Sequence, residues 1–400
     1  MKILITNAVP LNGGDEALLR ATIESLQVKC RGAKIKVLCT QMDLCRKYLP
    51  DIDFDSSLEF MRHDEYSLSC RIRRLLRNRL KIALTSRISL MLASRDERRV
   101  IGHYKKADII ISSPGGFLHD YYPVEERLNG IEMAVAMGKK VVIFAQSVGP
   151  FWKTQSIKQV KKVFPGLHRI SLRDNVSYGY LADIGLPMDN VYVTADAAFL
   201  WRHLAPELFV AKTGELKLFA MCFREWSYAG WEMKTLLHNA VKLCMHILDK
   251  ANHRIHFLST CQGVDGYGDD SGMASNIVQQ LPEELRKRCT VDRGRYSPRD
   301  LIREYAKCDA FIGMRLHGAI LSMLGGTPAM GLGYEEKTRG VFAPLGLERY
   351  QVSANADYEK WIECFDGFMK DARMIGRQLP LILDEAARAA EKNLDAVWQA

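Results

Sequence analysis

The chain has 400 residues, of which 48% are hydrophobic and 26% are charged. This composition is typical of a soluble globular protein and excludes disordered and fibrous classes, and the length predicts two domains. Lys and Arg outnumber Asp and Glu by 56 to 47, a net charge of +9, so nucleic acid, a membrane and an anionic substrate must each be considered as a partner.

The positive charge is concentrated in one segment. Residues 71–99 hold ten Lys or Arg and two acidic residues, a net +8, which leaves +1 for the rest of the chain. Within this segment Ile72, Leu75, Leu76 and Leu80 recur at helical spacing, with arginines on the other face. The pattern predicts either a basic amphipathic helix in contact with an anionic membrane or a solvated helix packed on its own domain. Nucleic-acid binding is not expected, because the segment has no interleaved aromatic residues.

The N-terminus and the cysteines indicate a cytoplasmic protein. Residues 1–6 lack the apolar run and the small-residue cleavage site of a signal peptide. Ten cysteines without a CxxC pair are too sparse for a disulfide framework. We therefore expect a reducing compartment, with peripheral attachment to the inner face of the cell membrane if residues 71–99 bind lipid.

Short β-rich runs alternate with helical patterns in two series, which predicts an α/β protein with two Rossmann-like doubly wound domains facing a central cleft. The expected strands are 2–6, 35–39, 108–112, 140–145, 169–172 and 191–194, then 216–223, 254–259, 310–313 and 328–331. The expected helices between them are 15–30, 124–138, 154–164 and 174–183, then 231–251, 273–288, 298–307 and 317–324.

These series predict the domain boundaries. The expected domains are 1–204 and 216–375, joined by a linker at 205–215. A final helix within 376–400, starting after the helix-breaking Pro380, is expected to pack back on the first domain.

In such sheets ligands bind at the carboxyl ends of the strands, so the residues directly after each strand are the candidates. The first strand is followed by Asn12, Gly13, Gly14 and Asp15. The two glycines allow a ligand to approach the backbone closely, and Asp15 is a candidate helix cap. A tight turn without a ligand is the plain alternative. The loop is not GxGxxG, so a nicotinamide cofactor is not expected.

The strand at 108–112 leads into a loop that contains Gly115, Gly116, His119 and Asp120, followed by two tyrosines. Sugar-binding sites combine flat apolar rings with polar partners for hydroxyl groups, as this loop does. The alternative is that the glycines only permit a turn and that the tyrosines only pack.

Two further strand ends carry polar side chains. Gln146 and Ser147 end the strand at 140–145, and Arg173 with Asp174 follows the strand at 169–172. Arg173 is either an anion ligand or a salt-bridge partner. Asp196, after the strand at 191–194, is a structural or hinge carboxylate.

The sharpest motif is Arg315-Leu316-His317, which links the strand at 310–313 to an apolar helix. A guanidinium beside a helix N-terminus favours a phosphate or carboxylate, and an imidazole supplies a proton near neutral pH. A capped helix with an inert histidine is the plain alternative. Lys337 follows the next strand and is expected beside Arg315.

Taken in chain order, these segments resemble the polysaccharide pyruvyl transferase family. Its members share an Asn-x-Gly-Asp-like loop, a Gly-rich turn, a Gln-Ser-x-Gly-Pro turn, an Arg-Asp pair, an Arg-Leu-His motif and a Tyr-x-x-Lys segment. The corresponding segments here are 12–15, 114–120, 146–150, 173–174, 315–317 and 334–337. The chain departs from the family pattern at Pro114, where a third glycine is common, and in the basic segment 71–99.

The resemblance implies a fold similar to the GT-B glycosyltransferases and transfer of pyruvate from phosphoenolpyruvate to a sugar as a cyclic ketal. Arg173, Arg315 and Lys337 would bind the donor, His317 would be the general acid, and Asp15 or Asp120 would serve the acceptor hydroxyls. The resemblance also implies that domain 1–204 is the acceptor side and domain 216–375 the donor side. The acceptor is expected to be a saccharide, on a polyprenyl-diphosphate carrier if residues 71–99 contact the membrane.

Two other functions remain open on the sequence. One is a GT-B glycosyltransferase that uses a nucleotide sugar, and the other is a catalytically silent saccharide-binding or membrane-assembly protein. We expect no metal and no cofactor, because the sequence has no HxxxH motif and no clustered carboxylate ligand set.

Overall fold

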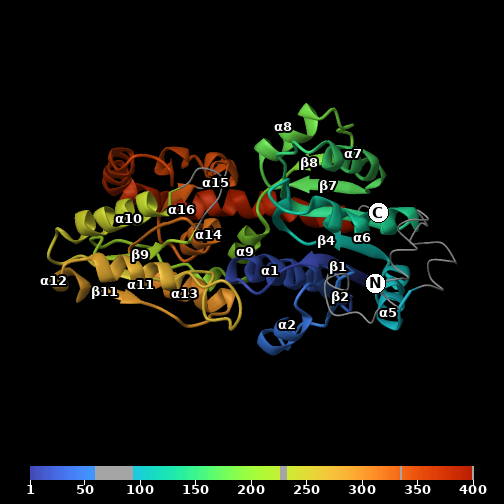
Figure 1. Cartoon of the computed structure of the whole chain (residues 1–400), viewed down its shortest axis with the longest axis horizontal. Coiled ribbons are helices and arrows are strands. Elements are labelled where there is room, and N and C mark those ends of the chain that lie inside the picture. Colours follow the sequence, from blue (N-terminus) through green and yellow to red (C-terminus); the bar gives the residue numbers. More distant parts are fainter. Residues whose placement is uncertain (59–92, 226–231, 334–335, 399–400) are drawn as a thin grey trace. The chain divides into compact units, whose positions relative to one another are not determined.

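The computed structural model describes residues 1–58, 93–225, 232–333 and 336–398. Its contacts divide the chain into two compact units. Unit 1 comprises residues 1–10, 22–194 and 392–400, and unit 2 comprises residues 11–21 and 195–391. Each unit contains one sheet with helices around it, and every pairing between described strands is parallel (Figure 1). The fold is therefore α/β with two Rossmann-like domains, as expected from the sequence.

The sheet of unit 1 has the strand order β3-β2-β1-β4-β6-β7-β8, and β5 pairs with β6 beside this path. Its strands are β1 (Lys2–Ala8), β2 (Lys34–Cys39), β3 (Phe54–Ser56), β4 (Ile109–Ser112), β5 (Gly115–Leu118), β6 (Lys140–Val148), β7 (Arg169–Leu172) and β8 (Val191–Val193). The chain order reverses between β1 and β4, and this switch point is where Rossmann-like sheets bind ligands.

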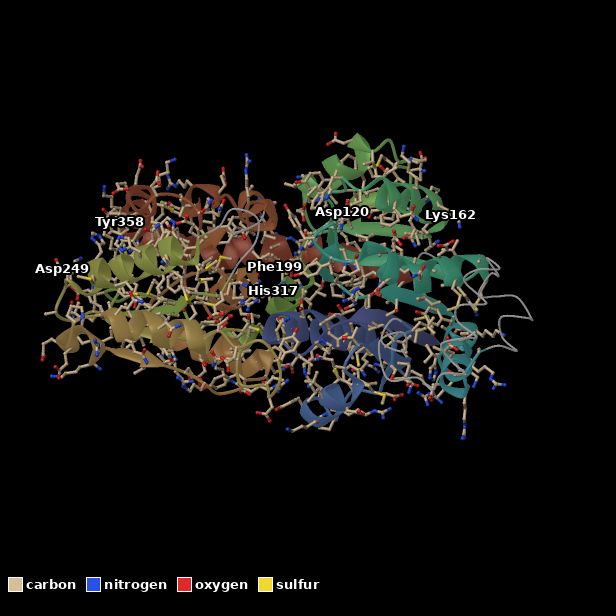
Figure 2. All side chains as sticks on the ribbon, in the orientation of Figure 1. Asp120, Lys162, Phe199, Asp249, His317 and Tyr358 are labelled. Atoms are coloured by element: carbon tan, nitrogen blue, oxygen red, sulfur yellow. The ribbon has the colours of Figure 1, made fainter. Side chains whose placement is uncertain are left out.

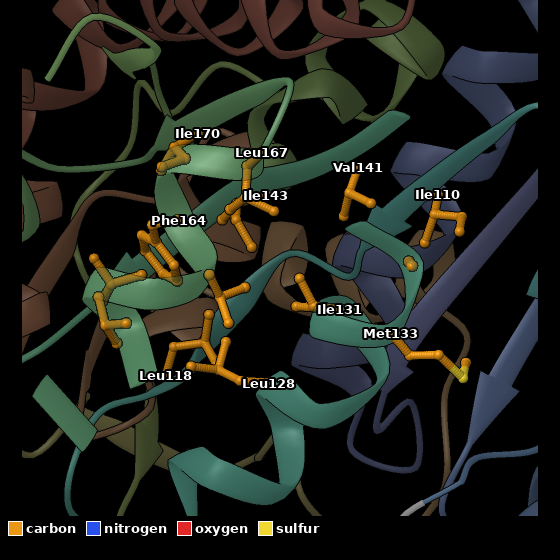
Figure 3. Close-up of a cluster of buried hydrophobic side chains, with 14 of the residues drawn as sticks. Ile110, Leu118, Leu128, Ile131, Met133, Val141, Ile143, Phe164, Leu167 and Ile170 are labelled. Atoms are coloured by element: carbon orange, nitrogen blue, oxygen red, sulfur yellow. The ribbon is translucent and has the colours of Figure 1, made fainter. Parts of the chain in front are cut away.

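One apolar layer of unit 1 lies between the sheet and the helices on one of its faces. Strand residues such as Ile110 and Ile143 point into this layer, where they meet Leu128 and Ile131 of a helix (Figure 3). The helices of unit 1 are the second half of α1 (Gly13–Lys29), α2 (Met42–Tyr48), α5 (Arg95–Lys106), α6 (Val124–Ala136), α7 (Thr154–Val163) and α8 (Asn175–Asp183). This apolar layer holds the strands in register, so that their carboxyl ends form one edge.

The sheet of unit 2 has the order β11-β10-β9-β12-β13-β14, with its switch point between β9 and β12. Its strands are β9 (Leu218–Cys222), β10 (Arg254–Phe257), β11 (Cys289–Val291), β12 (Ala310–Gly313), β13 (Ala329–Gly333) and β14 (Gln351–Ser353). Its helices are α9 (Trp201–Leu204), α10 (Met233–Leu248), α11 (Ser271–Gln280), α12 (Glu283–Arg286), α13 (Pro298–Lys307), α14 (Leu316–Leu324), α15 (Glu336–Phe342) and α16 (Tyr358–Trp398), preceded by the 3-10 turn η3 (Ala197–Leu200).

The C-terminal helix differs from its prediction. Helix α16 begins at Tyr358 and runs through Pro380, which was expected to precede its start. Proline lacks a backbone donor and crowds the preceding turn, and the burial of apolar residues along this helix, such as Trp361, Phe368 and Leu379, offsets that cost. The last turns belong to unit 1, where Asn393 accepts a hydrogen bond of 2.7 Å from Thr194.

The division into units also differs from the expected boundaries at 204 and 216. The first half of α1 groups with unit 2, because Gly13 N–H donates to the carbonyl of Thr260 and the Trp201 indole donates to the carbonyl of Ala17. Residues 195–204 also belong to unit 2. The loop expected on the acceptor side of the protein therefore lies in the same unit as His317.

The basic segment falls largely outside the described residues, which resume at residue 93. Its last part forms the start of α5, where Ser94 caps the helix by accepting from the N–H of Glu97. Arg99 binds Asp55 of β3 at 3.0 and 3.1 Å. None of the described helices combines the length and apolar character required to cross a bilayer.

Candidate active site

The carboxyl edge of unit 2 contains a buried ion pair beside its switch point. Arg315 follows β12 directly, and its Nε and Nη2 each donate to Asp270 at 2.7 Å. Asp270 immediately precedes α11, and its side chain is 7% exposed against 17% for Arg315. This two-point contact fixes the plane of the guanidinium, which a single contact would leave free to rotate.

The surroundings of Asp270 are polar but not nucleophilic. The hydroxyl of Ser259 donates to Asp270, and the thiol of Cys222 lies 3.2 Å from that hydroxyl. Burial and the nearby Asp270 carboxylate raise the pKa of Cys222 to about 12. Burial also raises the pKa of Cys261 to about 11. Both cysteines are therefore protonated near neutral pH, and neither provides a thiolate.

His317 lies in the first turn of α14, which packs against η3. Figure 2 labels His317 and, from η3, Phe199. The Nε2 atom of His317 is 3.5 Å from an Oδ of Asp196, whose side chain is fully buried. The other oxygen of Asp196 accepts from the N–H of Ala198 at 2.9 Å and so holds the carboxylate in place. Nε2 has no hydrogen-bond partner among the described residues.

Gly14 packs directly on the imidazole of His317. A Cβ at Gly14 would lie 2.7 Å from Nδ1 and 2.8 Å from Cβ of His317, so only glycine leaves room for this ring. A Cβ at Gly13 would lie 2.7 Å from Leu301 and 3.1 Å from the carbonyl of Thr260. The groups close to these glycines belong to the protein itself, and one of them is the catalytic candidate. The expected close approach of a ligand stays a prediction.

Helix α1 is capped differently from the prediction. Asn12, and not Asp15, is the cap: its side-chain oxygen accepts from the N–H of Asp15 at 2.9 Å, and its amide donates to the Asp15 carboxylate. The next residue, Glu16, is 1% exposed and accepts from Arg20 at 2.7 Å and from Arg295 at 2.5 Å. Arg295 lies between β11 and α13, so this contact ties α1 to the loop after β11.

A second cation, Arg224, accompanies Arg315 on this edge. It follows β9, the strand that pairs with β12. Burial has the largest effect on the pKa of Cys261 and raises it, whereas the charges of Arg315 and Arg224 lower it. Both guanidinium groups therefore lie near this thiol. Leu316 is buried in the first turn of α14. Lys337 belongs to α15, but its side chain is outside the described residues.

The carboxyl edge of unit 1 holds the other predicted residues. Arg173 is 3% exposed, and its Nε donates to the hydroxyl of Ser147 at 2.7 Å. That hydroxyl donates to Asp174 at 2.5 Å, and Asp174 caps α8 by accepting from the N–H of Ser177 at 2.7 Å. Arg173 and Ser147 are therefore joined in one buried network.

Gln146 lies deeper in unit 1 than its prediction as a ligand residue implies. It is fully buried, and its amide donates to Ser112 at 2.9 Å and to the carbonyl of Ser113. Asn7 donates to the same Ser112 hydroxyl at 3.2 Å. This network joins the ends of β1, β4 and β6. The loop with Gly115 and Gly116 is a short strand, in which Gly115 pairs with Gln146 at a φ of 140° that favours glycine.

The side chains of His119 and Asp120 contact backbone groups of neighbouring segments in unit 1. His119 is 4% exposed, and its Nε2 lies 3.1 Å from the carbonyl of Gly116. One Oδ of Asp120, labelled in Figure 2, accepts from the N–H groups of Trp152 and Lys153 at 2.6 Å each. The other Oδ has no hydrogen-bond partner in the described part of the chain.

Several residues at these edges were not predicted. Asp270 and Arg295 lie in loops without a motif, and Arg224 directly follows the predicted strand at 216–223 but belongs to no motif. Asp196 was assigned only a structural or hinge role, although its place after a predicted strand was a usable signal. Within the described residues, no cluster of three or more His, Cys, Asp or Glu side chains is arranged to bind a metal ion.

Comparison with known proteins places the chain in a family. The AmsJ amylovoran biosynthesis protein of Erwinia amylovora is 27% identical over 372 residues, which cover 87% of this chain and 86% of that protein. A putative UDP-N-acetylglucosamine 2-epimerase from Listeria monocytogenes has a TM-score of 0.61 at 10% identity, covering 99% of this chain and 95% of that one. HepE from Anabaena, solved with UDP-glucose, has a TM-score of 0.57 at 13% identity, covering 100% and 96%.

The two structural similarities show a shared fold alone, namely two Rossmann-like domains of the GT-B type. The family model for polysaccharide pyruvyl transferases matches residues 12–336. That match spans the Asn12 loop, the Arg173–Asp174 pair and the Arg315-Leu316-His317 motif, so the resemblance inferred from the sequence is confirmed. The chain belongs to the polysaccharide pyruvyl transferase family.

Proposed function

We propose that the protein transfers the pyruvyl group of phosphoenolpyruvate to two hydroxyl groups of a saccharide and forms a cyclic ketal. The observation that carries the proposal is the arrangement around α14: a guanidinium fixed by Asp270, and a histidine enclosed by Gly14 and the buried Asp196. This places a fixed cation and a proton-transfer group two residues apart on one strand-to-helix turn.

The proposed donor needs more than one positive charge, because it carries a phosphate and a carboxylate. Arg315 and Arg224 follow the paired strands β12 and β9, next to the switch point of unit 2. The N-terminus of α14 adds backbone N–H groups, and no side chain caps it within the described residues. Arg173 and Lys337 remain proposed donor ligands, on the strength of their place after a strand and of the family motif.

The proposed reaction begins with proton transfer from His317 to the methylene carbon of phosphoenolpyruvate. That carbon becomes a methyl group, and the neighbouring carbon becomes electrophilic. One sugar hydroxyl adds there, and a second hydroxyl of the same sugar displaces phosphate and closes the ring. Of the two hydroxyl protons, one restores the protonated histidine and one leaves with the phosphate. Atoms and charges therefore balance without an oxidant or reductant.

Asp196 is a positioning residue in this scheme. It is fully buried, held by the N–H of Ala198, and only 3.5 Å from the His317 ring. A fixed carboxylate beside a ring nitrogen selects the orientation and the tautomer of the imidazole. Gly14 confines the other side of the ring. Together these contacts hold His317 in one place while the substrates change.

Asp15 and Asp120 are the proposed partners of the acceptor hydroxyls. Asp15 is half-buried and bonded to Asn12 at the start of α1. Asp120 already accepts two backbone hydrogen bonds with one oxygen, while its other oxygen has no partner within the described segments. That second oxygen is shielded from solvent, so the proposed role of Asp120 rests on its place in the loop after β5 and on the family motif.

For the acceptor we propose a saccharide on a polyprenyl-diphosphate carrier, with residues 71–99 in contact with an anionic membrane. The support is the net charge of +8 in that segment and its helical spacing of apolar residues. Co-sedimentation with anionic vesicles tests this contact. Changing Arg73, Arg74 and Arg77 to Glu should release the protein from the vesicles. Equal binding of the changed and unchanged proteins to the vesicles would refute the membrane contact.

The function itself is tested by phosphate release. The protein is incubated with phosphoenolpyruvate, with and without a panel of saccharide acceptors, and inorganic phosphate is measured. We expect release only when an acceptor is present, and we expect phosphoenolpyruvate, unlike UDP or GDP, to raise the melting temperature. Stabilisation by UDP alone would favour a nucleotide-sugar glycosyltransferase, and absence of phosphate release with every acceptor would favour a catalytically silent protein.

A further inference from the structure

An exposed group of aromatic rings lies on the carboxyl edge of unit 1. Tyr121 is 40% exposed, Tyr122 is 44% exposed and Trp152 is 48% exposed. Tyr121 and Tyr122 follow β5, and Trp152 follows β6, the strand that pairs with β5. The ring centroids of Tyr121 and Trp152 are 4.8 Å apart and their planes meet at 72°. The two rings therefore form a corner open to solvent.

This corner is held by buried contacts beneath it. His119 is 4% exposed and contacts both tyrosines, with ring centroids 5.2 Å from Tyr121 and 4.9 Å from Tyr122. Asp120 accepts from the N–H groups of Trp152 and Lys153, and its own N–H donates to the carbonyl of Pro150 at 3.2 Å. The loop after β5 and the loop after β6 are thus joined on both sides of the rings.

We propose that Tyr121 and Trp152 form a stacking platform for a pyranose ring of the saccharide acceptor. This inference rests on the proposed function, and it names the acceptor subsite within unit 1. A pyranose presents a face of C–H bonds, which matches an exposed aromatic ring, and a rim of hydroxyls, which need polar partners. Here the phenol of Tyr121 and the Lys153 ammonium are the polar groups beside the rings.

The size of the group argues against a protein partner. A stable protein interface buries about 800 Å² on each side and needs some 20 residues. The platform offers two neighbouring rings and a third tyrosine, at the strand ends where this fold binds small ligands. Rings held by backbone anchors also lose little conformational entropy when a flat ligand stacks on them. A single sugar ring fits these features.

The binding test uses methyl glycosides of glucose, galactose and mannose, and the disaccharides lactose and maltose. In saturation-transfer NMR on the whole protein, saturation of protein protons should reach the ring C–H protons of at least one of these probes. Trp152→Ala should reduce the saturation that reaches the probe, and Trp152→Phe should retain most of it. Tyr192→Ala is the control, because Tyr192 is also 44% exposed in unit 1 but packs under Arg169.

The kinetic test separates the two substrates. For one ring, Tyr121→Ala or Trp152→Ala should raise the acceptor KM about 2- to 10-fold and leave the KM for phosphoenolpyruvate unchanged. Unchanged acceptor KM in both variants would overturn the platform while leaving the transferase intact. Saccharide binding that depends on Trp152 without any pyruvyl transfer would overturn the proposed function and leave the platform. Loss of vesicle binding in Trp152→Ala, with saccharide binding unchanged, would assign the rings to a membrane contact.

Discussion

The carboxyl edges of the two sheets share one topology but differ in chemistry. At the switch point of unit 2, charges are paired and partly accessible: Arg315 with Asp270, and His317 near Asp196. In unit 1 the corresponding polar groups, such as Gln146 and Ser112, are fully buried and bonded to one another. The groups that unit 1 exposes at this edge include the aromatic rings of Tyr121, Tyr122 and Trp152.

The difference suggests how a duplicated architecture serves two substrates. An anion is bound by fixed cations, so the donor suits unit 2. A neutral saccharide is bound by rings and scattered hydrogen-bond partners, so the aromatic acceptor subsite suits unit 1. Two proposed residues cross this division, Arg173 of unit 1 for the donor and Asp15 of unit 2 for the acceptor. The variants below test this division, in order from the largest expected effect to the smallest.

Removal of the proposed general acid should have the largest effect. We expect His317→Ala to lower kcat by about 10²- to 10⁴-fold, because general acid catalysis contributes that much. Binding of phosphoenolpyruvate, measured by calorimetry, should be nearly unchanged. The control is His246→Ala, since His246 also lies near a carboxylate, 3.2 Å from Asp366, but on the surface of α10. Full activity of the His317 variant would remove this residue from the mechanism.

Displacement of the same ring should have the next largest effect. In Gly14→Ala the new methyl group would meet His317 at 2.7 Å, and a shift of this ring by about 1 Å can cost about 10²-fold in rate. Gly272→Ala is matched, because Gly272 also lies near the start of a helix, α11, and has open space around its Cβ position. Melting temperatures show whether lost activity reflects unfolding. Equal activity of the two variants would mean that His317 need not be held.

Substitution of the fixed guanidinium should weaken the donor alone. Arg315→Lys keeps the charge but loses the two-point contact with Asp270, and we expect the Kd for phosphoenolpyruvate to rise about 10- to 100-fold. Arg303→Lys is the control, because Arg303 pairs with Asp300 on an exposed face of α13. Saccharide binding by unit 1 should not change in either variant. A loss of saccharide binding in Arg315→Lys would contradict the division between the units.

The smallest effects come from two buried carboxylates that contact histidines. Asp196 lies 3.5 Å from His317, and Asp55 lies 2.8 Å from His103 in unit 1. We expect Asp196→Asn to lower kcat about tenfold, because the ring loses its orienting charge. Asp55→Asn should instead lower the free energy of unfolding by about 1–3 kcal/mol and leave kcat unchanged. The loss of stability is limited, because the partner Arg99 is 47% exposed. If Asp196→Asn lowered only the stability and Asp55→Asn lowered only kcat, Asp196 would be the structural residue and Asp55 the positioning residue.

The Asp55 contact also has a pH signature. Burial raises the pKa of this carboxyl, but hydrogen bonds from His103, Ser56 and Arg99 outweigh burial and hold the pKa below its usual value. The contribution of Asp55 to stability is therefore complete above roughly pH 4, and it is lost as the pH falls through the lower folded-state pKa. Chemical unfolding at pH 7 and at pH 3 should show a smaller difference between Asp55→Asn and the unchanged protein at pH 3.

Much of the fold could be predicted because local pattern and tertiary structure agree. The β-rich runs at 109–112, 169–172 and 310–313 are strands within a residue of their predicted bounds. The short strands β3, β11 and β14, of three residues each, were missed because they carry too little periodicity to be distinguished from loops. The helix start predicted after Pro380 is wrong, because the packing of a long helix outweighs the cost of one proline within it.

The candidate site was predictable where function lies in a motif. Arg315-Leu316-His317 and the Asn12 loop were identified from residue type and position after a strand. Asp270 could not be identified, because it precedes Arg315 by 45 residues and only the fold brings the two together. Nor could the sequence show that the Asn12 loop joins unit 2, since that depends on contacts with Thr260 and Arg295.

The central claim is that this protein protonates phosphoenolpyruvate and moves its three-carbon unit to a saccharide. The most direct test is the reaction in D2O with an active acceptor, followed by mass spectrometry of the product and measurement of phosphate. We predict a ketal whose methyl group contains one deuterium, formed together with one phosphate, and we expect His317→Ala to lower the rate of formation of both products about 10²- to 10⁴-fold. A product without deuterium, or a glycoside made only when a nucleotide sugar is supplied, would contradict the account.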